Sequence, residues 1–206
     1  MGYVVTLAQQ KGGAGKTTLL AHLAHAWAAA GKTVAVVDLD PQSSLSQWLS
    51  LSDLPLDQIE TKDYRAGGDI KSAAREADYV LVDCPGSATT MLEAALRESD
   101  LVLVPCQPTA MDAWATGKIL EMAGKAKVPS RIVLNRVPPR GGAVEDTKAR
   151  VKESGGTVLK SSLGNRVAFA NGIARGTTAL GLARRSTAVD EVMALRKELD
   201  RVLKSL

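Results

Sequence analysis

Residues 9–18 read QQKGGAGKTT, a glycine-rich stretch that ends in a lysine and two threonines. In the phosphate-binding pattern G-x-x-x-x-G-K-[ST], the backbone N–H groups of such a turn surround phosphates, and its lysine reaches the β and γ oxygens. Lys16 occupies the position of that lysine, whereas the first glycine of the pattern falls at Gln10. Lys11 stands where a neutral residue would serve. The stretch therefore predicts a phosphate-binding loop with one cation more than the loop requires.

The segments on either side of this loop have the composition that the loop needs. Residues 3–8, YVVTLA, are a β-branched apolar run, and residues 17–30, TTLLAHLAHAWAAA, have the apolar spacing of a helix. Strand, glycine loop and helix in this order are the context in which the pattern binds phosphate. The alternative is a chance glycine-rich turn between a core strand and a core helix, which leaves both lysines without a role.

Lys11 suggests a site shared between two subunits. Its side chain cannot easily fold back onto phosphates that the loop already surrounds, so we expect it to reach a nucleotide bound by a second copy in an ATP-sandwich homodimer. Residues 11–18, KGGAGKTT, resemble the deviant Walker A motif, KGGxGK[ST][ST], of the ParA/MinD family of P-loop ATPases. In that family the corresponding lysine crosses the dimer interface, so the resemblance implies the same role for Lys11.

Apolar runs alternate with stretches of helical periodicity along the chain. This alternation predicts an α/β fold, namely a mainly parallel sheet with helices on both faces in a P-loop NTPase architecture. We expect one domain over 1–206, with surface loops at 51–68 and 136–143. Strands are expected near 3–8, 33–38, 79–83, 100–105, 131–135 and 157–159, and helices near 16–30, 43–50, 69–77, 89–97, 110–125, 143–153 and 187–204.

Carboxylates follow two of the expected strands, at the end where open α/β sheets bind ligands. TVAVVDLDPQ brings Asp38 and Asp40 to the end of one strand, and ADYVLVDCPG brings Asp83 to the end of another. Next to a triphosphate, such carboxylates organise Mg²⁺ and the attacking water. For Asp38 and Asp40 the alternative is a solvated turn, which the following Pro41 favours.

The family resemblance gives these residues separate roles. Asp38 and Asp40 lie in a stretch similar to the family's Walker A′ motif, which implies that Asp40 positions the attacking water and Asp38 supports the metal site. Asp83 lies in a stretch similar to a Walker B motif and, together with Thr17, is expected to hold the Mg²⁺. Phosphoryl transfer requires mainly positioning and charge neutralisation, so this set is sufficient for ATP hydrolysis.

Further residues complete the expected ATP site. Lys11, Lys16 and Asp40 are the expected catalytic residues, with Lys11 acting in trans like an arginine finger. RIVLNRV resembles the family strand that ends in an adenine-reading asparagine, so Asn135 is a candidate for the adenine contact; a turn cap is the alternative. The expected ATP-binding residues are Gly12, Gly13, Ala14, Gly15, Lys16, Thr17, Thr18 and Asn135.

Positive charge is concentrated in the second half of the chain. Residues 1–103 hold 8 Lys/Arg and 13 Asp/Glu, whereas residues 104–206 hold 18 and 9. Such an excess suits a polyanion, and non-specific DNA binding needs several cations on one face. The resemblance to ParA-type partitioning ATPases implies DNA binding in the ATP state, with release when a cargo-bound, ParB-like partner stimulates an otherwise weak hydrolysis. The candidate DNA-binding residues, each of which could also be an ordinary solvated charge, are Lys148, Arg150, Lys152, Arg166, Arg175, Arg184 and Arg185.

Two other functional classes share this scaffold. A MinD-like positioning ATPase binds membranes through a basic C-terminal amphipathic helix. Here the last helix mixes four acids with four bases and lacks Trp and Phe, so packing against the sheet explains it better. A metabolic or cluster-handling enzyme ranks lower, because Cys84 and Cys106 form no C-x-x-C and read as small buried hydrophobes. His22 and His25 lack an evident third ligand, so we expect helix packing rather than metal binding.

The sequence also carries expectations about location. No apolar run approaches the roughly 18 residues of a membrane span, and the first expected strand begins within three residues of the start. We therefore expect a cytoplasmic, nucleoid-associated protein with no secretory signal and no operator-reading helix-turn-helix before the first strand. The cargo stays open among a plasmid, a chromosome region and a large protein assembly.

Overall fold

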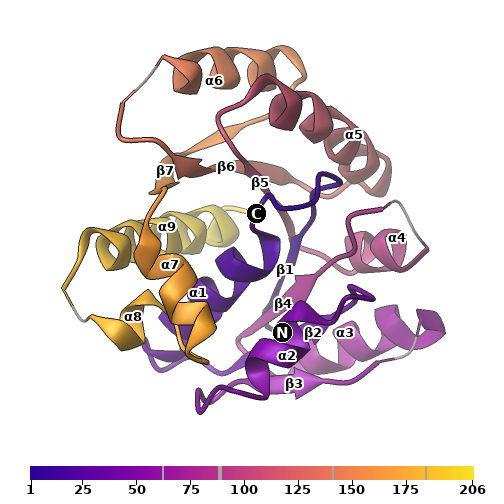
Figure 1. The fold of residues 1–206 in the computed structure, drawn as a ribbon. Helices are drawn as coiled ribbons and strands as arrows, with labels where there is room; N and C mark the ends of the chain where they lie inside the picture. The colour runs from indigo at the N-terminus through magenta and orange to yellow at the C-terminus, as the bar shows by residue number, and fades with distance from the viewer. Residues whose placement is uncertain (62, 88–89, 141, 184) are drawn as a thin grey trace.

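The computed structural model describes residues 1–61, 63–87, 90–140, 142–183 and 185–206. Their strands form one seven-stranded sheet of order β3-β2-β4-β1-β5-β6-β7, in which each neighbouring pair is parallel. Helices cover both faces of this sheet (Figure 1), so the predicted α/β class is confirmed. The strands are β1 (Tyr3–Leu7), β2 (Val34–Asp38), β3 (Asp57–Ile59), β4 (Tyr79–Asp83), β5 (Leu101–Cys106), β6 (Ser130–Val137) and β7 (Val158–Gly164).

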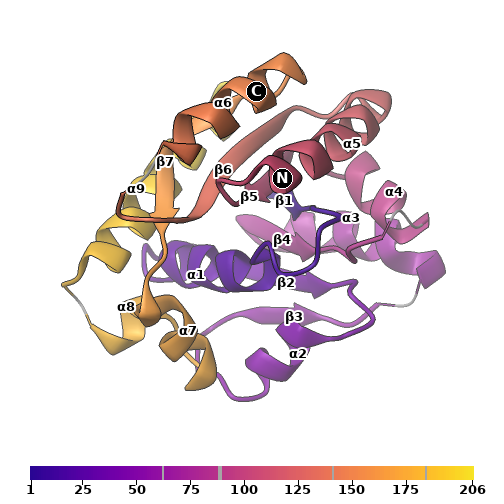
Figure 2. The ribbon, with the colours of Figure 1, turned by 45° about the horizontal axis from the view of Figure 1, so that its top comes forward.

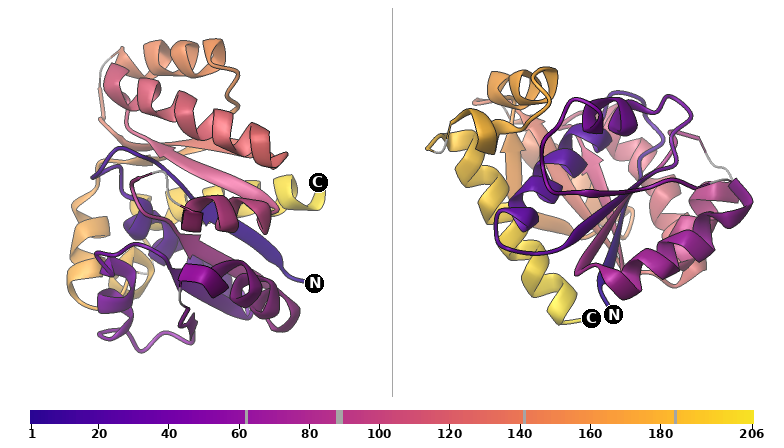
Figure 3. Two further views of the ribbon diagram at one scale, coloured as in Figure 1. Left: turned by 90° about the vertical axis from the view of Figure 1, so that its right-hand side faces the viewer. Right: turned by 90° about the horizontal axis from the view of Figure 1, so that it is seen from below.

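The helices divide between the two faces. Strand side chains alternate in direction, so Val5 of β1 packs into one core and Val4 into the other. The first core includes α1, α2, α7, α8 and α9, and the second includes α3, α4, α5 and α6. Figure 3 shows α9 and α3 on opposite sides of the strands. The helices are α1 (Lys16–Ala28), α2 (Ser44–Leu49), the 3₁₀ turn η1 (Asp63–Arg65), α3 (Ala66–Glu76), α4 (Thr90–Arg97), α5 (Ala110–Ala126), α6 (Ala143–Glu153), α7 (Val167–Ala174), α8 (Ala179–Leu182) and α9 (Thr187–Lys204).

The surface loop predicted over 51–68 is wrong in part. The segment contains β3, η1 and the start of α3. Among the described strands, β3 pairs only with β2, and its Asp57 and Gln58 are exposed. This short polar edge strand therefore lacks the apolar alternation that marks a strand. At the other edge, β7 extends beyond the expected 157–159 because its SSLG continuation pairs with β6.

Other element boundaries also differ from the predicted ones. β6 runs to Val137, inside the predicted loop at 136–143, and α3 begins at Ala66 rather than near 69. Residues 62, 89 and 141 of the predicted segments lie outside the described part of the chain. Element ends carry weaker periodicity than their centres, which explains shifts of a few residues.

The last helix packs in the way the sequence indicated. Val192, Leu195, Leu199 and Leu203 of α9 are buried in the first core, against β7 and α1. Figures 1 and 2 show α9 and α6 on the two sides of the β7 edge. Leu206, which follows the end of α9, is 58% exposed. The apolar face of α9 is therefore occupied by the core of its own chain.

Three smaller expectations can be compared with this fold. Cys84 and Cys106 are free and buried, as expected for small hydrophobes. His22 contacts Thr18 and Ala179, and His25 contacts Thr178, which confirms a packing role. Across the described ranges, no helix is long and apolar enough to cross a membrane.

Candidate nucleotide-binding site

The phosphate-binding loop connects β1 to α1 at the carboxyl end of the sheet. Gly13 and Gly15 have φ angles of +76° and +90°, which L side chains rarely adopt. A Cβ atom on Gly15 would lie 2.5 Å from Nδ2 of Asn135, so this position requires glycine for space as well. The loop leads directly into the N-terminus of α1, whose free N–H groups and dipole favour an anion.

Lys16 is the first residue of α1 and is buried. Its Nζ donates to the carbonyl oxygen of Gln9 across the loop at 3.2 Å. It also lies close enough to Asp83 to lower the pKa of that carboxyl group, and it lines the cleft described below. Lys16 is thus held inside the loop, where the motif requires its charge.

Thr17 and Asp83 join the loop to the end of β4. The Thr17 hydroxyl donates to Oδ2 of Asp83 at 2.6 Å. Asp83 is fully buried, and its Oδ1 has no hydrogen-bond partner among the described residues. Burial is the largest cause that raises the pKa of Asp83 to about 7, with Asp38 and Asp40 adding to the rise and the Thr17 hydrogen bond and Lys16 opposing it.

This pair fits a magnesium ion. An orphaned buried carboxylate oxygen beside a threonine hydroxyl leaves two oxygen donors where a hard cation would otherwise balance the charge. Mg²⁺ commonly takes one or two protein ligands and keeps waters and phosphate oxygens for the rest. Within the described part of the chain, no group of three or more His, Cys, Asp and Glu side chains is arranged to hold a metal.

The two acids at the end of β2 have different surroundings. Asp40 lines the phosphate cleft, and its Oδ1 accepts from the Gln42 backbone N–H at 3.0 Å. Asp38 accepts from the Asp40 N–H at 3.1 Å and from both N–H and hydroxyl of Ser46 at 2.8 and 2.9 Å. Both oxygens of Asp38 therefore fix the loop that carries Asp40. Its predicted support of the metal is indirect in this geometry and stays a prediction.

Two adjoining cavities meet at the loop. The phosphate cleft, of about 610 Å³, is lined by Gly12, Gly13, Lys16, Thr17 and Asp40 among others. The second cavity, of about 470 Å³, lies beyond Gly15 between the end of β6 and α7. Gly15, Thr18 and Arg136 line both. One molecule with a phosphate chain and a base can therefore extend from one cavity into the other.

Asn135 lines the second cavity and supports the loop. Its Nδ2 donates to the Ala14 carbonyl oxygen at 2.8 Å, and its Oδ1 accepts from the Arg136 N–H at 2.9 Å. The Asn135 amide thus has two partners within the protein, and its contact with adenine stays a prediction. Arg136, which the sequence did not single out, is exposed in a left-handed conformation with φ +53°. Its place beside both cavities gives it access to a bound nucleotide.

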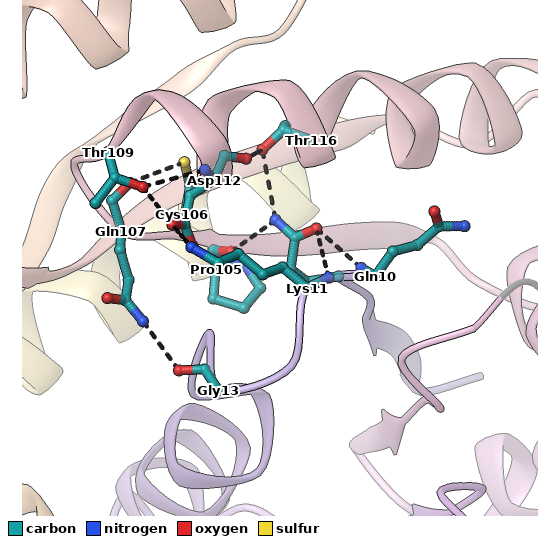
Figure 4. A network of polar contacts seen from close by, with 10 residues as sticks. Gln10, Lys11, Gly13, Pro105, Cys106, Gln107, Thr109, Asp112 and Thr116 are labelled. Carbon is teal, nitrogen blue, oxygen red and sulfur yellow. Dashed lines mark hydrogen bonds and ion pairs between the residues drawn. The ribbon is translucent and has the colours of Figure 1, made fainter.

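Lys11 has a different environment from Lys16. Its Nζ forms an ion pair with Oδ2 of Asp112 in the first turn of α5 (Figure 4). It is not among the residues that line the phosphate cleft. Lys11 and Asp112 are 101 residues apart, so only the fold brings them together. The sequence carried no local feature that identifies Asp112.

The candidate DNA-binding residues do not form one cluster. Lys148, Arg150 and Lys152 belong to α6, whereas Arg166, Arg175 and Arg185 lie around α7 and α8 on the other face of the sheet (Figure 1). Arg184 lies outside the described residues. Lys148 pairs with Glu145 at 2.8 Å, and Arg166 pairs with Glu191 at 2.7 Å. A shallow groove of about 600 Å³ between α6 and β7 adds a cation that the sequence missed, Lys160, beside Lys148 and Lys152.

A glycine loop at a helix N-terminus, with its lysine turned inward and a hydroxyl set against a buried aspartate, defines a P-loop nucleotide-binding protein. Comparison with known families agrees with this class and narrows it. Residues 5–179 match the CobQ/CobB/MinD/ParA nucleotide binding domain, and the chain belongs to this family.

Individual relatives extend over nearly the same length. Maintenance of carboxysome distribution protein A from Halothiobacillus neapolitanus is 29% identical over 208 residues, which cover 96% of each chain. Protein ParA from Rhizobium radiobacter is 30% identical over 177 residues, covering 81% of this chain and 80% of ParA. The septum site-determining protein MinD from Pyrococcus horikoshii, solved with Mg-ADP, superposes with a TM-score of 0.83 at 19% identity, covering 98% and 97% of the two chains. That last likeness shows the shared fold.

Proposed function

We propose that the chain is an ATPase that dimerises when it binds ATP, binds DNA non-specifically in that state, and positions or segregates a cargo through partner-stimulated hydrolysis. The main observation behind this proposal is the position of Lys11. Lys16 already supplies the cation that the loop requires, and Lys11 is a second cation whose side chain points toward α5 and does not line its own phosphate cleft. The ParA and carboxysome-distribution relatives support the same class of function.

Within one subunit, the loop N–H groups and Lys16 bind the phosphates of ATP, and the second cavity receives its base. Mg²⁺ held by Thr17 and Asp83 would neutralise charge on the phosphates and orient them. Asp40 lines the cleft and accepts a proton from, or orients, the attacking water. Lys11 of a second copy supplies the additional charge that the transition state requires. Hydrolysis by an isolated subunit is therefore slow.

The DNA-binding part of the proposal rests on charge. Two basic groups lie on opposite faces of the sheet, one at the α6 and β7 groove and one around α7 and α8. Non-specific binding to phosphates needs such groups to act together, and pairing two subunits would join them into a longer basic surface. Binding of this kind would place the protein on the nucleoid, within the cytoplasm. The chain would act as one ParA-type domain.

The experiment that tests this function measures binding to random-sequence duplex DNA and to anionic liposomes, each with ATP, with ADP and without nucleotide. Asp40→Ala holds the ATP state, because it removes the residue that activates the water. We expect the protein to bind DNA with ATP but not with ADP or without nucleotide. The affinity for DNA should fall by at least about tenfold between roughly 50 and 200 mM salt. Lys152→Glu tests the basic group on α6, and Arg175→Glu tests the group around α7. The matched charge control is Lys125→Glu, at a lysine of α5 that pairs with Glu121.

The other outcomes assign the function elsewhere. Liposome binding without DNA binding would favour the MinD-like membrane alternative, and binding to neither in any nucleotide state would contradict the proposed function. The partner step is tested separately by adding basic peptides to the protein with ATP and DNA and measuring phosphate release. We expect the peptides to raise turnover; unchanged turnover with every candidate peptide would remove this step.

A further inference from the structure

The contact between Lys11 and Asp112 joins the phosphate-binding loop to α5. Asp112 has no exposed surface, while the Lys11 side chain is 36% exposed. Figure 4 shows the Lys11 side chain extending from the loop toward the first turn of α5. The charge proposed to act on another subunit is therefore engaged by an anion of its own chain.

The buried carboxylate of Asp112 is stabilised by the charge of Lys11. Its Oδ2 accepts from Lys11 and from the Thr109 hydroxyl, and its backbone N–H donates back to Thr109 Oγ1 at 3.1 Å. Its Oδ1 is buried without a hydrogen-bond partner in the described chain. If Lys11 leaves, a buried carboxylate keeps one hydroxyl as its side-chain donor, which is an unfavourable state for an ionised group. Release of Lys11 must therefore be compensated by another interaction.

The surrounding contacts keep the two segments in register. Gln9 donates through Nε2 to the Pro105 carbonyl oxygen at 3.2 Å, and its Oε1 accepts from the Gln10 N–H at 2.9 Å. Gln107 donates through Nε2 to the Gly13 carbonyl oxygen at 2.9 Å. Figure 4 shows Gln107 reaching from the segment after β5 to Gly13 of the loop. These bonds fix the Lys11 backbone, so a change at Asp112 acts on the side chain of Lys11.

We propose that Asp112 regulates dimerisation by holding Lys11 in cis until a second copy presents a nucleoside triphosphate. This inference rests on the proposed function and adds a regulating residue to the same site. Asp112 and the phosphates of the second copy compete for one ammonium group. A triphosphate carries more negative charge than a diphosphate and competes better, so the ion pair makes dimerisation selective for ATP over ADP.

The first test uses the nucleotide-free protein and needs no hydrolysis. Reductive methylation followed by mass spectrometry reports the reactivity of each lysine amine, which falls when an ion pair shields the amine from the reagent. We expect Asp112→Asn to raise the reactivity of Lys11 at least fivefold while Lys125, paired with Glu121 on the outside of α5, is unchanged. Asp112→Ser, which also removes the charge, provides a second variant should Asp112→Asn fail to fold. Equal Lys11 reactivity in wild type and variant would overturn the inference.

The second test measures dimerisation by sedimentation in the Asp40→Ala background, with ATP or ADP. Adding Asp112→Asn is expected to lower the dimer dissociation constant at least tenfold and to reduce the difference between ATP and ADP. Adding Lys11→Ala as well should remove that gain, whereas a purely structural role of Asp112 would weaken the dimer whichever residue stands at position 11. An unchanged or weaker dimer with Asp112→Asn would contradict the inference.

The two proposals fail in different ways. If Lys11→Ala alone dimerises and hydrolyses ATP like the wild type, the trans role in the proposed function is wrong. If Lys11→Ala abolishes hydrolysis but Asp112→Asn leaves dimerisation unchanged, the proposed function stands and the regulation by Asp112 is wrong.

Discussion

His22 on α1 should make the folded protein sensitive to mild acid. Its Nδ1 lies 2.7 Å from the Thr18 carbonyl oxygen and donates to it, while Nε2 lies 3.0 Å from the Ala179 backbone nitrogen and accepts from it. Only a neutral ring can make both contacts, because protonation would turn Nε2 into a donor that faces a donor. The pKa of His22 is lowered to about 4; burial is the largest cause, the hydrogen bond to Thr18 opposes it, and the charge of His25 adds to the lowering.

The size of the effect follows from linkage. The unfolded chain protonates this histidine near pH 6.5, and the folded chain does so only near pH 4. The contribution of neutral His22 to the free energy of unfolding is complete above about pH 6.5, declines as the pH falls, and is almost wholly lost by about pH 4. An interval of about 2.5 units, at roughly 1.4 kcal/mol per unit, gives a total loss of about 3–4 kcal/mol from the free energy of unfolding, of which about 3 kcal/mol falls between pH 7 and pH 4.

Two measurements check this prediction. Urea unfolding at several pH values should show the wild type losing about 3 kcal/mol more than His22→Gln between pH 7 and pH 4, because glutamine gains no proton. NMR titration of the ring protons should give a pKa near 4 for His22; burial also lowers the pKa of His25, the second of the two histidines. A His22 pKa near 6.5, or equal acid sensitivity in wild type and variant, would refute the reasoning.

Other substitutions probe the site and the core. Gly15→Ala places a Cβ 2.5 Å from the Asn135 amide at a positive φ, and calorimetry should show nucleotide affinity reduced by at least about tenfold; Gly117→Ala, where a Cβ meets nothing within 4 Å, should bind normally. Asn135→Ala removes the support of the Ala14 carbonyl and should weaken nucleotide binding while lowering the free energy of unfolding by about 1–3 kcal/mol. Leu199→Ala, at a fully buried position of α9, should cost about 2–5 kcal/mol in urea unfolding, against less than about 0.5 kcal/mol for exposed Leu206→Ala. Normal binding by Gly15→Ala, or equal costs for the two leucines, would contradict these assignments.

The sequence was most informative where a local pattern carries the structure. The central strands are continuous apolar runs because both faces of a parallel sheet are covered, and the phosphate-binding loop has a fixed spacing of glycines and lysines. Thr17 and Asp83, which the family resemblance assigned to the metal site, lie in contact. The short polar strand β3 carries no such pattern and was missed.

Long-range pairings were beyond the reach of pattern analysis. Nothing near Asp112 in the sequence indicates that it binds Lys11, and nothing near Arg166 indicates that Glu191 pairs with it. The count of basic residues was right, but only the fold shows that α6 and α7 carry them on different faces. Asn135 illustrates the same limit, because its contact with the Ala14 carbonyl depends on how β6 meets the loop.

A mixing experiment tests most directly whether the ATPase site is shared between two subunits. Lys11→Ala keeps its own Asp40 but supplies no lysine in trans, whereas Asp40→Ala supplies Lys11 to its partner but cannot activate water. Each variant alone should be inactive. Mixed in equal amounts, they should recover about a quarter of the wild-type turnover per subunit, since half the dimers are mixed and each has one complete site. Mixtures that stay inactive while sedimentation shows mixed dimers, or a Lys11→Ala protein that is active alone, would contradict the account.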